Sequence, residues 1–178
     1  MKEVSVFNIC STWLEGLQWS TKMCLENAGI SIDYILVLWQ PSDEVLEWVK
    51  QNKKDNWYIK IYESDPKLTD MENLRSCFNI GFSHGFLHNN WCCGINTDMA
   101  FGKDFIKNLY KFRDEKSILN CRQIEPSNSI HEIKDFGIPG ENFREEDFLI
   151  YCQSISQDKC ISEEEWGRRC DSTPHLIH

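Results

Sequence analysis

Apolar and polar positions form four short, distinctive segments within residues 1–113. Residues 4–9 and 57–62 alternate with the two-residue period of a strand. Residues 33–39 and 91–95 are nearly continuous apolar runs, which are typical of strands buried on both faces. The four segments predict four strands of one sheet.

Helical patterns follow these strands. Two helices are expected to begin with a capping box, Thr-x-x-Glu, at residues 12–15 and 69–72. Another begins at residues 41–44, a fourth covers residues 105–110, and Gly29 supplies a stop for the first. Because strands and helices alternate with short connections, we expect an α/β fold with a mainly parallel sheet flanked by helices.

The pattern loosens after residue 113, where polar turns separate shorter elements. A chain of 178 residues suits one domain. We therefore expect residues 114–178 to form a short second lobe, packed on the sheet that residues 1–113 build.

The cysteines bear on the compartment of the protein. There are nine, an odd number, with no CxxC pair, and Cys92-Cys93 lies inside an apolar run. Reduced, structural cysteines are favoured over a disulfide framework. The chain also shows no signal-peptide pattern and no run of ~18 apolar residues that would span a membrane. These features predict a cytoplasmic protein.

The charge pattern excludes one class of partner. The net charge is −9, acidic residues gather at 145–147 and 163–165, and no basic patch is visible. Nucleic-acid binding is therefore not expected. A phosphate-bearing ligand remains compatible with this charge, because backbone amides, a few arginines and a divalent cation can bind phosphate locally.

The loop after the fourth strand has the best candidate chemistry. In Asn96-Thr97-Asp98 two oxygen-bearing side chains are two residues apart, so an extended backbone points both the same way. Hard divalent cations prefer such oxygen ligands. Ligands of parallel sheets also gather at the carboxyl ends of the strands. The alternative is a solvated turn without a ligand.

A longer stretch gives this motif a context. The segment Asn73-Leu-Arg-Ser-Cys-Phe-Asn-Ile-Gly81-Phe-Ser-His-Gly85, followed by a strand and Asn-x-Asp, resembles family 2 glycosyltransferases of the GT-A fold. The resemblance covers residues 3–113. Cys121-Arg-Gln-Ile-Glu-Pro126 and Ile133-Lys-Asp-Phe-Gly137 further resemble bacterial and large-virus members. The resemblance implies a Rossmann-like GT-A sheet that binds a nucleotide sugar, with a short C-terminal acceptor lobe.

The resemblance also implies roles for individual residues. Asp98, with Asn96, would hold Mn²⁺ or Mg²⁺; Asn96 replaces a carboxylate of the family's usual motif, which should weaken metal affinity. Arg75 and Asn79 would face the diphosphate, although a surface arginine paired with Glu72 is the alternative. The nucleotide base and ribose would lie against four residues for which helix capping is the alternative: Ser11, Thr12, Ser42 and Asp43.

The general base is the least defined element. A carboxylate is the best group to deprotonate an attacking hydroxyl, and in the family it usually comes from the second lobe. Glu146 and Asp147 resemble that element, with Asp171 as a rival. An acidic helix face without catalytic function is the alternative for Glu146 and Asp147.

Two functions remain open. The first is a metal-dependent and inverting transferase that moves a sugar from a nucleotide-diphosphate donor, UDP-sugar as first choice, to a hydroxyl of a glycan, lipid or protein. The second is a degenerate domain that binds a nucleotide sugar or a partner without turnover. A nucleotide enzyme of another fold is disfavoured, because neither GxGxxG nor GxxxxGK[ST] is present.

Overall fold

The computed structural model describes residues 4–97, 99, 102–113, 119–120, 134–137, 141–148, 150–151 and 175–177. A six-stranded sheet in the order β3-β2-β1-β4-β6-β5 forms its centre. The strands are β1 (Val4–Cys10), β2 (Ile32–Trp39), β3 (Trp57–Tyr62), β4 (Trp91–Asn96), β5 (Leu119–Asn120) and β6 (His175–Ile177).

Strands β1 to β4 run parallel, and β6 pairs antiparallel with β4 and β5. The predicted α/β fold with a mainly parallel sheet is therefore confirmed. All four predicted strands lie in this sheet, and their ends differ from the predicted ends by no more than one residue.

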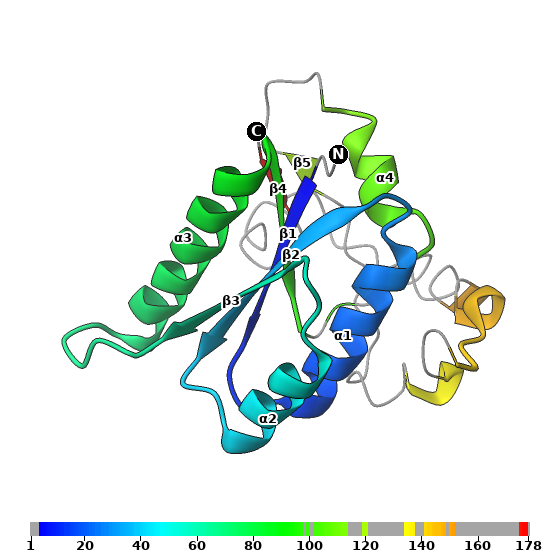
Figure 1. Cartoon of the computed structure of the whole chain (residues 1–178). Coiled ribbons are helices and arrows are strands. Elements are labelled where there is room, and N and C mark those ends of the chain that lie inside the picture. Colours follow the sequence, from blue (N-terminus) through cyan, green and yellow to red (C-terminus); the bar gives the residue numbers. More distant parts are fainter. Residues whose placement is uncertain are drawn as a thin grey trace.

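Helices cover both faces of the sheet (Figure 1). They are α1 (Leu14–Asn27), α2 (Asp43–Asn52), α3 (Asp70–His88) and α4 (Phe105–Tyr110), and a 3-10 turn, η1, covers Lys134–Phe136. Of the described helices, α3 packs on one face and α1, α2 and α4 pack on the other. The sheet is thus the middle of three layers.

Alternate residues of the central strands feed two separate cores. On the α1 side, Tyr34 and Leu36 are fully buried with Leu17. On the α3 side, Phe7 and Ile35 are fully buried in a second cluster. Burial on both faces explains why the second strand is written as a continuous apolar run rather than an alternating one.

Two glycines let α3 approach the sheet closely. A Cβ on Gly81 would collide with the ring of Phe7, and one on Gly85 would collide with the thiol of Cys92. Phe82 of the same helix packs edge-on against Phe7, with ring centroids 4.6 Å apart. The backbone of α3 therefore lies directly on β1 and β4.

The predicted helix starts have different outcomes. The Thr69 capping box is present, with Thr69 and Glu72 bonded reciprocally. The capping box predicted at residues 12–15 is wrong. The N-cap position of α1 is Trp13, whose side chain makes no capping hydrogen bond. Leu14 N–H bonds the Thr12 carbonyl at 3.1 Å. The helix therefore starts one residue later, and the glutamate falls at the second helical position instead of the third.

The described cysteines are reduced. Cys10, Cys24, Cys77, Cys92 and Cys93 are all buried and none of them forms a disulfide, which confirms the prediction for these five and for the Cys92-Cys93 strand in particular. Burial raises the pKa of Cys24 to about 12, and that of Cys92 equally, so both thiols stay protonated at neutral pH. The other four cysteines lie outside the described residues.

Two described residues beyond residue 113 contact α1. Phe143 meets Trp19 edge-on at 6.4 Å between ring centroids, and Lys22 Nζ pairs with Glu141 Oε1 at 2.6 Å. The boundary at residue 113 and the assignment of residues 114–178 to an acceptor lobe remain predictions. Among the helices described, none is long and apolar enough to cross a membrane.

Candidate functional site

The carboxyl ends of the four parallel strands meet at one edge of the sheet. Ile9 pairs with Asn96 in register, Cys10 with Leu38, and Trp39 with Tyr62. The loops that leave these strands are therefore neighbours. We refer to the residues that follow β1 to β4 at this edge as the carboxyl edge.

The β1 loop offers two hydroxyl groups to the carboxyl edge. Ser11 is half-buried and Thr12 exposed, and neither hydroxyl has a hydrogen-bond partner among the described residues. The thiol of Cys10 lies 3.7 Å from the carbonyl oxygens of both Ser11 and Trp13, which steadies the turn. Burial raises the pKa of Cys10 to about 11 against the smaller effect of the Trp13 contact. This thiol is therefore structural.

The β2 loop begins with a strained residue. Gln40 has φ 46°, a left-handed conformation that is uncommon outside glycine. Its N–H donates to the Tyr62 carbonyl at 3.1 Å, so pairing with β3 continues past the end of β2. Ser42 caps α2 by accepting from the Val45 N–H at 3.4 Å, and Asp43 is exposed in the first turn. Helix capping, the alternative function given for Ser42, is therefore confirmed.

Asn73 organises the β3 loop. Its side chain is 2% exposed, and its Oδ1 accepts from Tyr62 O–H at 2.8 Å and from Asp65 N–H at 2.9 Å. Its Nδ2 donates at 3.1–3.3 Å to three carbonyls, those of Asp65, Leu68 and Thr69. One buried amide thus fixes residues 63–69 against the first turn of α3.

A second contact ties the β2 and β3 loops together. The indole Nε1 of Trp39 donates to Ser64 Oγ at 2.7 Å. Neither this pair nor Asn73 was among the predicted site residues. The sequence signal for Asn73 is its helical spacing: the buried residues of α3 recur every four positions, from Asn73 through Cys77 and Gly81 to Gly85.

Arg75 and Asn79 lie on the exposed face of α3. Each stands two residues after a member of the buried stripe, and two residues rotate a helix by about 200°. Both side chains therefore face away from the sheet, and the structure does not bring them to the β1 and β2 loops. Their diphosphate role remains a prediction.

Asn96 is the last residue of β4 and is half-buried at the carboxyl edge. Its carbonyl accepts from Met99 N–H at 3.3 Å, so the chain turns sharply directly after the strand. Asp98, the main predicted metal ligand, lies outside the described residues. Within the described ranges no three His, Cys, Asp or Glu side chains converge as a metal site.

The candidate bases are exposed on a short helical stretch, residues 145–148. Asp147 pairs with Arg144 at 3.0 Å, and Arg144 also donates to the Asp135 carbonyl at 2.7 Å. Glu146 is exposed as well, so an acidic helix face accounts for this arrangement. Asp171 lies outside the described residues, and all three catalytic roles remain predictions.

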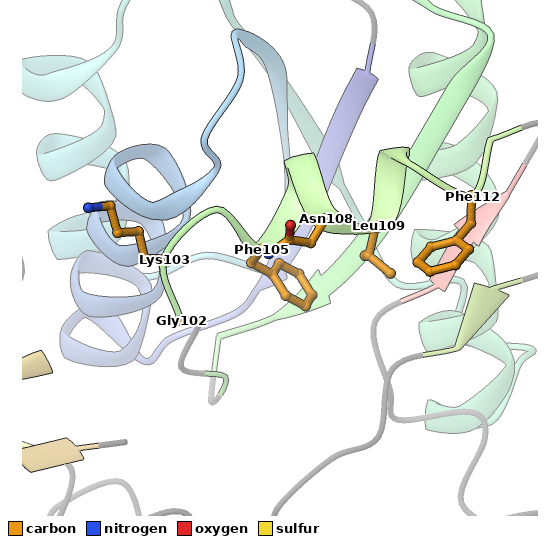
Figure 2. A pocket seen from close by; sticks show the side chains of 6 residues that line it. All are labelled: Gly102, Lys103, Phe105, Asn108, Leu109 and Phe112. Atoms are coloured by element: carbon orange, nitrogen blue, oxygen red, sulfur yellow. The ribbon is translucent and has the colours of Figure 1, made fainter. Parts of the chain in front are cut away.

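A shallow hollow lies beside α4 (Figure 2). It has a volume of about 250 Å³, and its walls are mainly apolar: Gly102, Lys103, Phe105, Asn108, Leu109 and Phe112. None of the predicted site residues contributes to it, and it holds no carboxylate. The hollow therefore does not compete with the carboxyl edge as the candidate site.

No protein-family model and no curated protein sequence matches the chain. Among solved structures, it is similar to a protein described as a nucleotide-diphospho-sugar transferase from Desulfovibrio desulfuricans G20, with 9% identity and a TM-score of 0.47 over 67% of this chain and 58% of the other. It is also similar to the galactosyltransferase LgtC, with 7% identity and a TM-score of 0.47 over 67% of this chain and 47% of the other. The similarity to mouse xyloside xylosyltransferase 1 has 11% identity and a TM-score of 0.41 over 79% of this chain and 63% of the other.

The chain thus spans 58% and 47% of the length of the first two of these structures. The class that the coordinates define is an α/β protein with a mainly parallel sheet flanked by helices. With TM-scores below 0.5, these similarities identify no reaction, donor or metal.

Proposed function

We propose that this chain is a metal-dependent, family 2-like glycosyltransferase of bacterial or large-virus type. It would transfer a sugar from a nucleotide-diphosphate donor, UDP-sugar first, to a hydroxyl acceptor. The observation that carries this proposal is the shared register of β1, β2 and β4. It makes the loops with Ser11, Ser42 and Asn96 neighbours at the edge where parallel sheets bind their ligands.

Local chemistry at this edge suits a diphosphate. The start of α2 is the positive end of a helix dipole, which favours anions, although Ser42 already accepts from the Val45 N–H and two carboxylates, Asp43 and Glu44, stand in the same turn. The hydroxyls of Ser11 and Thr12 can donate to ribose or phosphate oxygens. Gln40, the first residue of the β2 loop, has a left-handed backbone conformation that costs stability, and such strain is common in ligand-binding loops.

The donor set at the end of β4 fits a hard cation. Asn96 offers an amide oxygen where the strand ends, and Asp98 follows two residues later with a carboxylate. When bound, Mn²⁺ or Mg²⁺ would neutralise charge on the departing diphosphate. With one carboxylate, the residues themselves would bind the cation weakly, so most of its ligands would be donor phosphates and water.

An acceptor hydroxyl of a glycan, lipid or protein must lose its proton as it attacks the anomeric carbon. A carboxylate of the second lobe, from Glu146, Asp147 or Asp171, would take that proton. Attack from the face opposite the diphosphate would invert the anomeric centre. The reduced thiols of the described residues support action in the cytoplasm.

The rival function is nucleotide-sugar binding without turnover. It is favoured by one observation: Asp147 is exposed and its carboxylate is already paired with Arg144. The two functions share the donor site and differ only in hydrolysis or transfer.

A donor screen separates these possibilities. UDP-, GDP- and dTDP-sugars are titrated calorimetrically into the chain with and without Mn²⁺, and nucleotide release is measured in parallel. Metal-dependent binding with release supports the transferase. Binding without release, also in the presence of simple sugar and lipid acceptors, supports the binding domain. The absence of metal-dependent binding for every nucleotide would refute the transferase, and the absence of any binding would refute both.

A further inference from the structure

Two histidines lie one helical turn apart at the end of α3. His84 and His88 both belong to this helix, which ends at His88. Residues four apart share a helix face, with Cβ atoms roughly 6 Å apart. Figure 1 shows α3 running along its face of the sheet from the loop after β3 to the start of β4.

The neighbouring edge strand β3 holds this pair in place. The ring of His88 stacks on Tyr58, with centroids 3.9 Å apart and planes 25° from parallel. Lys60 of the same strand is close enough to act electrostatically on His84, as is His88. The stack limits the orientations of the His88 ring.

The surroundings of His84 keep its imidazole neutral, the form that a metal ligand needs, although the charge of Lys60 opposes a cation. Partial burial first, and then the charges of Lys60 and His88, lower the pKa of His84, so its imidazole is neutral at neutral pH and keeps one ring nitrogen without a proton. The C-terminal turn of a helix also attracts cations through its unpaired carbonyls. Lys60 acts in the opposite direction, because its ammonium group repels any metal ion bound nearby.

We propose that His84 and His88 bind one late transition-metal ion, with Zn²⁺ as the cellular ion, through one ring nitrogen each. Water would fill the other positions, since no third His, Cys, Asp or Glu of the described ranges joins a metal-ligand group. Imidazole ligands suit Zn²⁺, Ni²⁺ and Cu²⁺, whereas Mg²⁺ and Mn²⁺ prefer oxygen. The site therefore differs in chemistry from the cation site proposed at the carboxyl edge.

It also differs in position. The two histidines stand 14 and 18 residues after Asp70, the first residue of α3. At 1.5 Å per residue this places them roughly 24 Å from the end of the helix that meets the carboxyl edge. The proposal therefore stands independently of the glycosyltransferase assignment.

Ni²⁺ is the probe of choice, because thiols compete more strongly for Zn²⁺ and Cu⁺. Ni²⁺ is titrated calorimetrically into the reduced full chain, and its paramagnetic broadening is followed by NMR. We expect one site whose binding broadens the signals of Tyr58 and Lys60. His84→Asn and His88→Asn should each abolish it, and Lys60→Gln should tighten it roughly threefold.

The matched control keeps the number of histidines and changes only their spacing. In the double variant Ser83→His, His84→Asn the two imidazoles stand five residues apart, on different faces of α3. Ser83 is exposed, so the fold should tolerate the change, and circular dichroism verifies it. Loss of the site in this variant supports the proposal. Retained binding there, retained binding in both single variants, or no Ni²⁺ site in the unmodified chain would overturn it.

Discussion

The two edges of the sheet treat their polar groups differently. The amino edge is the side of the sheet where β1, β2 and β4 begin. There, Ser5 Oγ donates to the Gly85 carbonyl at 2.9 Å, and Asn89 Nδ2 donates to Ser5 Oγ and Asp33 Oδ2, both at 2.9 Å. These buried groups satisfy one another. At the carboxyl edge, Ser11 and Thr12 keep hydroxyls with no described partner. Polar groups therefore bond one another at the amino edge and in the β2 and β3 loops of the carboxyl edge, whereas the β1 loop is the place where we propose that they meet a ligand.

The largest expected effect comes from Asp98, the only carboxylate of the predicted metal motif. Asp98→Asn should abolish Mn²⁺-dependent donor binding and leave the thermal midpoint unchanged, because the amide keeps the size and hydrogen-bonding capacity of the carboxylate. Asn96→Asp should strengthen metal binding by adding a second carboxylate. Calorimetry with UDP-sugar and Mn²⁺ measures both. Unchanged metal-dependent binding in Asp98→Asn would show that the cation lies elsewhere.

The next effect tests how the carboxyl edge is built. Asn73→Ala leaves the Tyr62 hydroxyl and three loop carbonyls without their buried partner, so it should cost about 3 kcal/mol of unfolding free energy. It should also weaken donor binding, because residues 63–69 lose their attachment to α3. Urea denaturation and calorimetry of the folded fraction give the two numbers.

Asn73→Asp serves as the matched variant. Its carboxylate can still accept from Tyr62 and from the Asp65 N–H, but it cannot donate to the loop carbonyls. Donor affinity between that of the unmodified chain and that of Asn73→Ala is expected. If Asn73→Ala lowered stability while donor affinity stayed constant, the β3 loop would not belong to the site.

A smaller effect is expected at the opposite edge. Asn89→Ala removes the amide that joins Ser5 to Asp33, which should cost about 2 kcal/mol by leaving a buried carboxylate short of one donor. Donor affinity should not change, because Asn89 lies beyond the far end of α3. The same two measurements apply. A drop in donor affinity equal to that of Asn73→Ala would erase the distinction between the two edges.

The sequence predicted the sheet well for a physical reason. A parallel strand that is buried on both faces needs apolar residues at nearly every position, and a run as short as residues 33–39 is too brief for a buried helix. Glycines and capping residues likewise marked the end of α1 and the start of α3. These signals are local, so one chain suffices to read them.

The site was less predictable, because it depends on contacts between distant segments. The role of Asn73 depends on where Tyr62 and Asp65 fold, which no spacing rule reveals. The outward orientation of Arg75, in contrast, could have been inferred from helical phase, since it stands two residues after the buried Asn73. The resemblance to a family assigned a role to this residue without testing its direction.

The smallest expected effect concerns the capping box at the start of α3, which supports the β3 loop from outside. Glu72 Oε2 accepts from the Thr69 N–H and hydroxyl, both at 2.8 Å. These bonds, the backbone one first, lower the pKa of Glu72, and nearby Arg75 adds a smaller effect. A carboxyl whose pKa is lower in the folded state stabilises the fold above its unfolded pKa, and this contribution is lost as pH falls through the folded value.

We therefore expect a thermal midpoint that falls slightly more between pH 6 and pH 3 in the unmodified chain than in Glu72→Gln, because glutamine accepts the same bonds without titrating. Thr69→Ala, which removes the hydroxyl donor, should show an intermediate pH dependence. Differential scanning calorimetry across this range provides the comparison. Identical pH profiles for all three proteins would mean that the ionised Glu72 gains nothing from the cap, and that the geometry of the capping box alone anchors the start of α3.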